Sequence, residues 1–394
     1  MALDLPAIQR ALRESGLDGW LLYDFHGSNP IATRLSGVDR SAHLTTRRWY
    51  YLIPREGEPR ALVHAIERHN LDLLPGRKTV YGRREQLEAG LTELLKGVKR
   101  IAMEYSPECA IPYVSRVDAG TAEAIKARGV EIVSSGDLVQ AFEAVWTPEQ
   151  LESHRVASQA LYRIKDKAFA AAAAALRAGA PLTEYQLQQQ MVAWFAQEGL
   201  VSDSAPVVAV GPHAGNPHYL PTEASASVIG PDELLLLDLW GKLAQPGAVF
   251  ADITWVGFTG REVPAPMATA FDAAARARDA AVELVQAAAR DGRDLRGWEV
   301  DRAARAVLVA AGFESQVLHR TGHSLGESVH GNGAHLDDFE THDDRRLLPG
   351  TGFTVEPGVY LADFGVRTEI NVFRGDREAL VTGPCQGAIV PLLS

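Results

Sequence analysis

The chain has 394 residues, of which 46% are hydrophobic and 23% are charged, a composition typical of a globular protein. Its formal net charge of -11 argues against nucleic acid as the main partner, and no stretch approaches the roughly 20 apolar residues of a membrane helix. The two cysteines, Cys109 and Cys385, exclude a disulfide framework. The N-terminal segment has the pattern of an amphipathic helix rather than of a signal peptide, so we expect a cytoplasmic protein.

The first part of the chain, residues 1–146, alternates helical and strand patterns. This alternation predicts an α/β domain with a mixed sheet. No glycine-rich phosphate loop follows any of its predicted strands, and the polar loop Phe25–Pro30 has the composition of an ordinary loop. The predicted helices are Leu3–Arg13, Arg84–Lys96 and Val117–Arg128, and the predicted strands are Gly19–Tyr23, Trp49–Ile53, Arg60–His64, Arg100–Tyr105 and Val130–Gly136.

A domain boundary is predicted near Trp146. Thr147 is followed by a proline and, three residues after the threonine, by Gln150, which is the signature of a capping box at a helix start. The helix should run to Arg177, and a second capping box at Thr183 should begin another that ends near Gln197. We therefore predict one domain over residues 1–146 and a second over residues 147–394.

The second domain is predicted to be a sheet flanked by helices, so the fold class of the whole chain is α+β. A helix pair divides its strands into two groups. The predicted helices are Pro266–Arg290 and Gly297–Ala311, and the predicted strands are Ala205–Gly211, Ser225–Gly230, Leu234–Gly241, Phe250–Phe258, Phe353–Leu361 and Gly365–Phe373.

The segment HRTGHSLGESVH places three histidines, His319, His323 and His330, in one short glycine-containing stretch. Histidine is a common metal ligand and also transfers protons near neutral pH. By itself the segment fits a surface loop equally well, and His213 and His335 have the weaker pattern of loop residues.

Two aspartates lie on consecutive predicted strands. Asp238 ends the apolar run LLLLD, and Asp252 lies in FADITW after a connection with the composition of a hairpin. Antiparallel pairing would bring both carboxylates to one face, within reach of a metal ion. The pair by itself fits two turn-capping residues equally well.

Two glutamates also lie on consecutive predicted strands. Glu356 and Glu369 are each in an apolar strand pattern, and a short turn joins the two strands. Buried carboxylates require a cation or a hydrogen-bonded partner. Arg367 is two residues from Glu369 and shares its strand face. It is expected either to form a salt bridge to Glu369 or to bind a substrate carboxylate.

Four carboxylates and His323 together form a hard, anionic set of donors. Such a set favours two divalent ions, with Mn²⁺ the first choice and Co²⁺ or Zn²⁺ the alternatives, over one structural zinc, which prefers Cys and His. Two ions about 4 Å apart hold a shared hydroxide and polarise a carbonyl group.

The order Asp, Asp, His, Glu, Glu in these contexts resembles the pita-bread metallopeptidases of the creatinase fold (M24), which include methionine aminopeptidase, aminopeptidase P and prolidase. The matching segments are ELLLLDLWG, FADITWVG, GHSLGESVH, TVEPGVY and RTEINV. The first domain resembles the α/β N-terminal domain of aminopeptidase P, prolidase and creatinase, which argues against methionine aminopeptidase. The resemblance implies a creatinase-type N-terminal domain followed by a pita-bread catalytic domain.

The resemblance also implies a role for each matching residue. Asp252 and Glu369 would bridge two metals, Asp238 would complete one metal, and His323 with Glu356 the other. Glu356 would also take a proton from the attacking water.

Further residues match positions near the substrate in the proline-specific members. His218 and His330 would act at the scissile bond, while His319 and Arg367 would bind substrate. The chain departs from the family pattern at Trp240, Trp255, Arg320 and Gly331. None of these departures removes a ligand, but each puts the substrate in doubt.

The resemblance implies an Xaa-Pro dipeptidase that acts through a metal-bridging hydroxide on proline-containing dipeptides or short peptides. It also implies a homodimer. A second cation for the substrate carboxylate could come from His319, from Arg320 or from the N-terminal domain of the partner subunit. The alternatives are an Xaa-Pro aminopeptidase acting on longer peptides, a metal-dependent non-peptidase hydrolase or lyase of the same fold, and a catalytically inactive binding protein.

Overall fold

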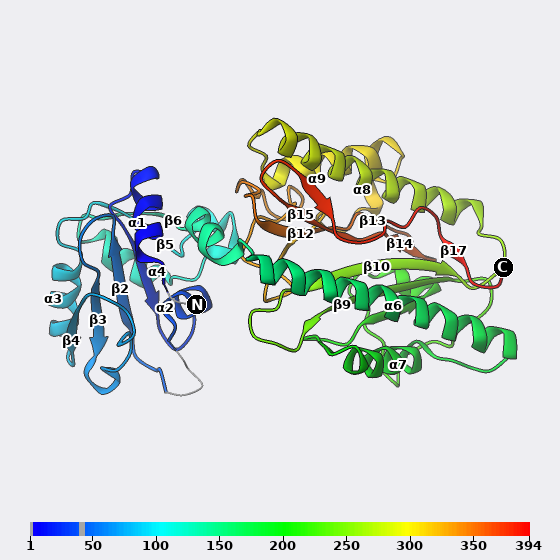
Figure 1. Ribbon diagram of the computed structural model, residues 1–394, viewed down its shortest axis with the longest axis horizontal. Helices are drawn as coiled ribbons and strands as arrows, with labels where there is room; N and C mark the ends of the chain where they lie inside the picture. Colours follow the sequence, from blue (N-terminus) through cyan, green and yellow to red (C-terminus); the bar gives the residue numbers. More distant parts are fainter. Residues whose placement is uncertain (1–2, 39–43) are drawn as a thin grey trace. The chain divides into compact units, whose positions relative to one another are not determined.

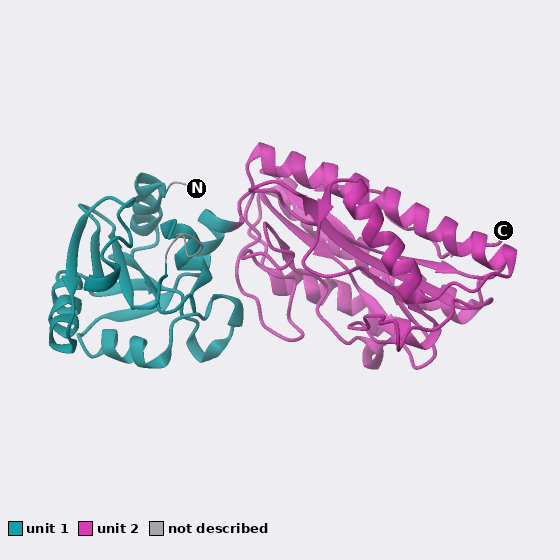
Figure 2. Cartoon of the chain, turned by 90° about the horizontal axis from the view of Figure 1, so that it is seen from below, with its two compact units in different colours: residues 1–143 teal, residues 144–394 magenta. Residues whose placement is uncertain are grey.

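The computed structural model describes residues 3–38 and 44–394. The chain forms two compact units, Met1–Glu143 and Ala144–Ser394, coloured separately in Figure 2. None of the helices in the described part of the chain combines the length and the apolar character that a membrane span requires.

The first unit is built on a six-stranded sheet with the order β4-β3-β2-β1-β5-β6. β1 pairs with β2 in the antiparallel sense and with β5 in the parallel sense, so the sheet is mixed, as predicted. The strands are β1 (Gly19–Asp24), β2 (Trp49–Pro54), β3 (Arg60–His64), β4 (Arg77–Tyr81), β5 (Arg100–Met103) and β6 (Glu131–Ser134).

Helices cover both faces of this sheet, because successive side chains of its strands point to opposite sides. Leu21 and Tyr23 of β1 join a core with α3 and α4, whereas Trp20 and Leu22 join a second core with α1 and α2. The helices are α1 (Leu5–Glu14), α2 (Pro30–Ser36), α3 (Arg84–Leu94), α4 (Ala119–Lys126) and α5 (Gly136–Val139), with short turns η1 (Ala65–Glu67), η2 (Pro107–Cys109), η3 (Pro112–Val114) and η4 (Gln140–Ala144).

The elements of the first unit that were not predicted include α2 and β4. The loop Phe25–Pro30 leads directly into α2, where the Asn29 side chain accepts a hydrogen bond from the Ala32 amide and so caps the helix. β4 has the sequence RKTVY and lies at the sheet edge, where its mostly exposed side chains give no hydrophobic alternation.

The second unit begins with two long helices, α6 (Pro148–Ala178) and α7 (Glu184–Gln197). Both predicted capping boxes are confirmed, since the Thr147 side chain accepts from the Gln150 amide and the Thr183 side chain from the Gln186 amide. α6 ends at Gly179, whose positive φ of 62° suits glycine. α6 lies along β9 and β10 (Figure 1).

The strands of the second unit form two sheets and a hairpin. β10 pairs with β9 and β17, and β9 also pairs with β7 and β8. The second sheet has the order β11-β12-β15-β16, and β13 with β14 makes the hairpin. The strands are β7 (Leu200–Val201), β8 (Val207–Val210), β9 (Leu234–Leu243), β10 (Ala251–Phe258), β11 (Ser324–Leu325), β12 (Thr351–Val355), β13 (Gly358–Tyr360), β14 (Gly365–Arg367), β15 (Ile370–Arg374), β16 (Ala379–Val381) and β17 (Val390–Pro391).

The helix pair α8 (Ala265–Asp291) and α9 (Gly297–Ala310) packs against the strands near the C-terminus (Figure 1). The short turns of this unit are η5 (Gly211–Gly215) and η6 (Glu314–Gln316). Alanine-rich faces of α8 are fully buried, so the helix approaches those strands closely.

Three strand predictions need correction. Ser225–Gly230 is not a strand and contributes one isolated bridge, between Thr183 and Val228. Phe353–Leu361 divides into β12 and β13 at Glu356, since Pro357 lacks the amide that a continuous ladder needs. Gly365–Phe373 divides into β14 and β15, with Thr368 and Glu369 between them.

Candidate metal centre

The β9–β10 hairpin places two aspartates on one face. Asp238 lies opposite Thr254, and Asp252 lies opposite Trp240. Because Asp252 and Thr254 are two residues apart, their side chains share a face with Asp238. The leucine run before Asp238 is completely buried, and both carboxylates are themselves buried.

A close backbone approach delivers His323 to the same place. The Thr354 amide donates to the His323 carbonyl at 2.8 Å, and the His323 amide donates to Thr354 Oγ1 at 2.9 Å. Gly322 makes this approach feasible, because a Cβ there would lie 2.1 Å from the Thr354 carbonyl oxygen. A glycine is therefore required directly before the histidine.

Threonines orient the two glutamates, which lie at the strand breaks. Thr354 donates to Glu356 Oε1 at 3.1 Å, and Thr254 donates to Glu369 Oε2 at 2.7 Å. The amide of Glu369 also donates to the Thr254 carbonyl at 3.2 Å. Both glutamates therefore lie outside the regular strand pairing, and a threonine hydroxyl fixes the position of each carboxylate.

Acceptor atoms converge at this point without donors between them. His323 Nε2 lies 3.5 Å from Asp252 Oδ2 and 3.5 Å from Glu356 Oε1. His323 Nδ1 faces the Ser324 carbonyl at 3.1 Å, so the ring proton belongs on Nδ1 and the lone pair of Nε2 points at the carboxylates. One ligand atom from each of Asp252, His323 and Glu369 lies within 4.8 Å of the others.

This arrangement fits divalent cations by the chemistry of its donors. Asp252 Oδ1 is buried and has no hydrogen-bond partner among the described residues. Buried carboxylates that face each other and a lone pair repel unless a cation lies between them. The five predicted ligands are thus side by side, although their assignment as ligands remains a prediction.

The pKa values of the carboxylates reflect this crowding. Burial, followed by the charges of Asp238 and Glu356, raises the pKa of Asp252 well above its usual value. Burial, followed in size by the charge of Asp252, also raises the pKa of Glu369 well above its usual value. Burial also raises the pKa of Asp238, and the nearby charge of Arg367 opposes this rise.

Glu356 differs from the other three carboxylates. Burial is the largest influence on its pKa and acts to raise it, but His323, His319 and Arg367 together outweigh burial and lower the pKa. The side chain is also slightly more exposed than those of Asp252 and His323. Glu356 is therefore the carboxylate of this group that most readily carries its charge.

Arg367 is held by three partners. Its Nη2 donates to Asp238 Oδ2, its Nε to Thr254 Oγ1 at 2.9 Å, and its Nη1 to the Tyr360 hydroxyl at 3.2 Å. The salt bridge to Glu369, one of the two expected roles, is not among the described ion pairs, because the guanidinium pairs with Asp238. Arg367 and Glu369 both contact Thr254 Oγ1, which accepts from Arg367 and donates to Glu369. The guanidinium carries more N–H donors than these three bonds use.

His319 is connected to Arg367 through a tyrosine that the sequence did not single out. His319 Nδ1 lies 2.7 Å from the Arg320 carbonyl, so Nε2 accepts from the Tyr360 hydroxyl at 2.6 Å. Burial lowers the pKa of His319, which favours the neutral ring. A continuous polar chain therefore runs from Asp238 through Arg367 and Tyr360 to His319.

The other two predicted histidines lie in more exposed positions. The His330 ring packs edge-on against His323 with 4.3 Å between the ring centroids. His218 lies in the loop after η5 and has no described contact with the five candidate ligands. That loop packs against the β13–β14 turn, since a Cβ on Gly365 would lie 2.0 Å from the Ala214 carbonyl oxygen.

A buried glutamate that the sequence did not single out anchors the loop that carries His218. Glu184, at the start of α7, accepts hydrogen bonds from the Tyr219 hydroxyl at 2.6 Å and from the Ser227 amide at 2.8 Å. It also accepts from the Val210 amide at 2.7 Å and faces His213 Nδ1 at 3.0 Å. His213 is therefore one of the groups that anchor the loop to α7.

Other residues have a role that the sequence could not indicate. Asn371 Oδ1 accepts from the Asp252 amide at 2.9 Å, and its Nδ2 donates to the Asp252 carbonyl, so it fixes the backbone of β10. His335 is buried and its Nδ1 accepts from the Ser324 amide at 3.0 Å. An asparagine in a strand pattern and a histidine in a loop give no signal of such contacts.

Two departures from the family pattern have partners in the structure. Trp255 lies under the buried Lys165 of α6, whose Nζ is 3.9 Å from the ring centroid. Trp240 Nε1 donates to Asp203 Oδ1 at 2.7 Å. The Lys165 cation of α6 therefore packs on the face of the Trp255 ring.

A family model described as metallopeptidase family M24 matches residues 157–373, more than half of the chain. Among similar sequences, an Xaa-Pro dipeptidase of Lactobacillus helveticus is 31% identical over 175 residues. That match covers 44% of this chain and 43% of the relative, so this chain spans less than half the length of that curated relative.

Solved structures resemble nearly the whole chain. Dipeptidase PepE from Mycobacterium ulcerans superposes with a TM-score of 0.73 at 23% identity, covering 98% of this chain and 96% of that one. The prolidase from Pyrococcus horikoshii OT3 superposes with a TM-score of 0.63 at 19% identity, covering 97% and 98%. At these identities the similarity establishes the fold.

Proposed function

The chain belongs to metallopeptidase family M24, and from this premise we propose that it is a dinuclear peptidase that hydrolyses the Xaa-Pro bond of dipeptides. The predicted fold class is confirmed: the protein is α+β, with an N-terminal α/β domain and a pita-bread catalytic domain. We also propose residues 1–146 and 147–394 as the limits of the two domains.

One observation carries the proposal. The neutral Nε2 of His323 lies 3.5 Å from Asp252 Oδ2 and 3.5 Å from Glu356 Oε1, with its lone pair directed at these carboxylates. With Asp238 and Glu369 beside them, these groups supply enough oxygen ligands for two divalent ions. Asp252 and Glu369 are proposed as the bridging ligands.

Two such ions, when bound, lower the pKa of a shared water and polarise the carbonyl group of the scissile bond. Glu356 is proposed to take the proton of the attacking water, because its pKa is low enough to keep it charged. Thr354 holds Glu356 from one side and leaves its other oxygen free of described hydrogen bonds. His218 and His330 are proposed to act on the substrate at the scissile bond.

A dipeptidase must also bind the free carboxylate of the C-terminal proline. Arg367 is buried and is committed to Asp238, Thr254 and Tyr360, yet it retains N–H donors beyond these bonds. Together with His319 it is proposed to line the end of the pocket that receives this carboxylate. The name Xaa-Pro dipeptidase carried by the L. helveticus relative supports this choice.

The test compares three substrates on the same metal-loaded preparation: Ala-Pro, Ala-Pro amide and Ala-Pro-Ala. The proposal predicts the highest kcat/KM for Ala-Pro and an amide that differs mainly by a raised KM. Equal kcat/KM for the acid and the amide would instead favour an Xaa-Pro aminopeptidase. No hydrolysis of any of the three would favour a non-peptidase member of the fold or an inactive binding protein.

The identity of the metal, the cellular compartment and the oligomeric state are also proposed. Mn²⁺ is the preferred ion because the donors are mainly carboxylates. We also propose a cytoplasmic homodimer in which the partner subunit's N-terminal domain completes the pocket. Sedimentation of the purified chain and activity measured across its dissociation range test the last point, since a lone subunit should then lose activity.

A further inference from the structure

The N-terminal unit contains a pocket of about 820 Å³ that the proposed peptidase function does not use. Its lining comes from the carboxyl ends of β1, β3 and β4, the start of β2, and the first turns of α3 and α4. In open α/β sheets, ligands bind outside the carboxyl ends of the strands. The pocket also lies in the size range of small-molecule sites.

Four arginines surround this pocket although the chain as a whole has a net charge of -11. Arg47 and Arg48 precede β2, and Arg83 and Arg84 begin α3. Among the lining residues the one carboxylate is Asp118, which already accepts from the Tyr23 hydroxyl at 3.0 Å and from a helix amide. The pocket is therefore strongly positive.

The start of α3 adds to this positive charge. Arg83 occupies the cap position, and an arginine side chain cannot accept the hydrogen bonds of the first-turn amides. Cations at a helix N-terminus oppose the helix dipole, which favours anions there. Gln86 Oε1 accepts from the Gly82 and Arg83 amides at this helix start. Two arginines here still depart from the local preference, and such departures are expected at functional sites.

A tyrosine supplies a hydrogen-bond donor to the pocket. Tyr50 is 1% exposed and lines the pocket, and burial raises the pKa of its hydroxyl, which therefore keeps its proton. Its ring packs against Tyr23 with 5.0 Å between centroids, which fixes its direction. A protonated hydroxyl at the pocket wall can donate a hydrogen bond to a ligand oxygen.

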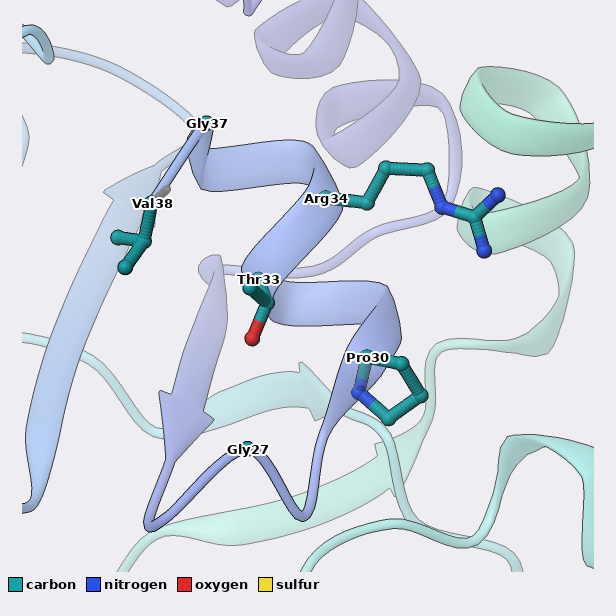
Figure 3. A pocket seen from close by; sticks show the side chains of 6 residues that line it. All are labelled: Gly27, Pro30, Thr33, Arg34, Gly37 and Val38. Atoms are coloured by element: carbon teal, nitrogen blue, oxygen red, sulfur yellow. The ribbon is translucent and has the colours of Figure 1, made fainter. Parts of the chain in front are cut away.

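A second hollow in the same unit has no comparable charge. It lies beside α2 and is lined by Thr33, Arg34 and their neighbours (Figure 3). Its arginine is already paired with Glu143 at 2.9 Å. In the arginine-rich pocket Arg84 is likewise paired, with Glu88 at 3.3 Å, but no ion pair is described for Arg47, Arg48 or Arg83, so positive charge is left there for a ligand.

We propose that the arginine-rich pocket binds an organic phosphate, a small molecule that joins a phosphate group to a planar ring. The phosphate lies between the pairs Arg47–Arg48 and Arg83–Arg84 and accepts from Tyr50. The ring lies against Phe25, whose side chain is 44% exposed at the pocket. This site is independent of the proposed peptidase activity.

Isothermal titration calorimetry of the full-length chain tests the proposal with adenosine monophosphate, inorganic phosphate and adenosine as probes. Adenosine monophosphate should bind, inorganic phosphate should bind more weakly, and adenosine should not bind at the same concentration. Arg48→Ala and Arg83→Ala should each weaken binding of adenosine monophosphate by roughly tenfold or more, and Tyr50→Phe by a few-fold. Arg10→Ala, which removes an exposed arginine of α1 away from the pocket, is the matched control and should bind like the wild type.

Each contrary result overturns a defined part of the proposal. No binding of adenosine monophosphate, or undiminished binding in both arginine variants, would remove the site. If adenosine bound as tightly as adenosine monophosphate, the proposed phosphate contact would be wrong. If inorganic phosphate bound as tightly as adenosine monophosphate, the proposed ring contact would be wrong. Arg48 and Arg83 have exposed side chains, so circular dichroism should show that both variants remain folded.

Discussion

The guanidinium of Arg367 donates to the carboxylate of Asp238, and the two residues come from strands far apart in the sequence. Both side chains are buried. Arg367 therefore neutralises the carboxylate of Asp238, whereas among the described residues no arginine or lysine is paired with Asp252 or Glu369. The part of the cluster that lacks an arginine is the part that should bind metal most strongly.

Replacing Arg367 by methionine should destabilise the metal-free protein by roughly 3–5 kcal/mol, because Asp238 is left buried without its partner. Urea unfolding in the presence of a chelator measures this change. Saturation with Mn²⁺ should reduce the penalty, since divalent cations also compensate Asp238. Arg276→Met, which breaks an exposed pair with Asp272 on α8, is the control and should change stability by less than about 1 kcal/mol. Equal penalties for the two variants would contradict the role of Arg367.

His218→Ala and His330→Ala should each lower kcat on Ala-Pro by roughly 100-fold or more while the bound metal stays constant. His342, an exposed histidine paired with Asp338, provides the control, and His342→Ala should retain wild-type turnover. Elemental analysis of the same samples separates a lost proton-transfer group from a lost metal. Wild-type kcat in both variants would show that His218 and His330 are ordinary loop residues.

Glu184→Gln should disturb the loop that carries His218, because a side-chain amide nitrogen cannot accept the hydrogen bonds that reach Glu184 from several donors. We expect a loss of stability of about 1–3 kcal/mol. We also expect a lower kcat/KM with metal content unchanged. Gln190→Glu, at an exposed site of α7, is the control and should be neutral. An unchanged kcat/KM in Glu184→Gln would contradict the claim that Glu184 positions the loop that carries His218.

The sequence was sufficient to predict the elements that follow regular patterns. Both capping boxes begin helices where Thr147 and Thr183 predict them, and the run of leucines before Asp238 forms the buried strand β9. The Asp238–Asp252 relationship also followed from the pattern, because a hairpin with period-two alternation leaves few ways to orient two carboxylates. These signals are local, so a single sequence contains them.

Other contacts depend on pairs of residues that only the fold brings together. Arg367 was expected to reach Glu369 along one strand face, but the strand ends at Arg367, which pairs with Asp238 and contacts Glu369 only through the Thr254 hydroxyl. Tyr360 and Glu184 gave no signal, since a tyrosine in a strand and a glutamate at a helix start are each ordinary. β4 was missed because an exposed edge strand needs no hydrophobic alternation.

Stability should depend on pH through His154, a buried histidine of α6. Burial lowers its pKa from 6.5 to about 4. Its Nδ1 faces the Phe250 carbonyl at 2.7 Å, so the neutral ring accepts from Thr382 Oγ1 through Nε2 at 2.8 Å. Between these pKa values the unfolded chain binds the proton more strongly than the folded chain, so stability falls as the pH falls through this window.

Urea unfolding of metal-free protein at about pH 7.5 and about pH 5 should show that His154 accounts for a loss of about 2 kcal/mol. His154→Gln removes the titrating group, so its stability should fall less between the two pH values than that of the wild type. The other buried histidines are present in both proteins and cancel in the comparison. An identical fall in the two proteins would contradict the lowered pKa of His154.

The central claim is that hydrolysis of Xaa-Pro dipeptides depends on two divalent ions held by the acidic cluster around His323. The most direct measurement is the rate of Ala-Pro hydrolysis followed as Mn²⁺ is added to metal-free protein, with bound metal counted in the same samples. We predict that activity rises to a plateau at about two ions per chain, as in two-metal sites, and that Asp252→Ala neither retains two ions nor hydrolyses Ala-Pro. Absence of Ala-Pro hydrolysis in wild-type protein that holds two ions, or full activity in Asp252→Ala, would contradict the account.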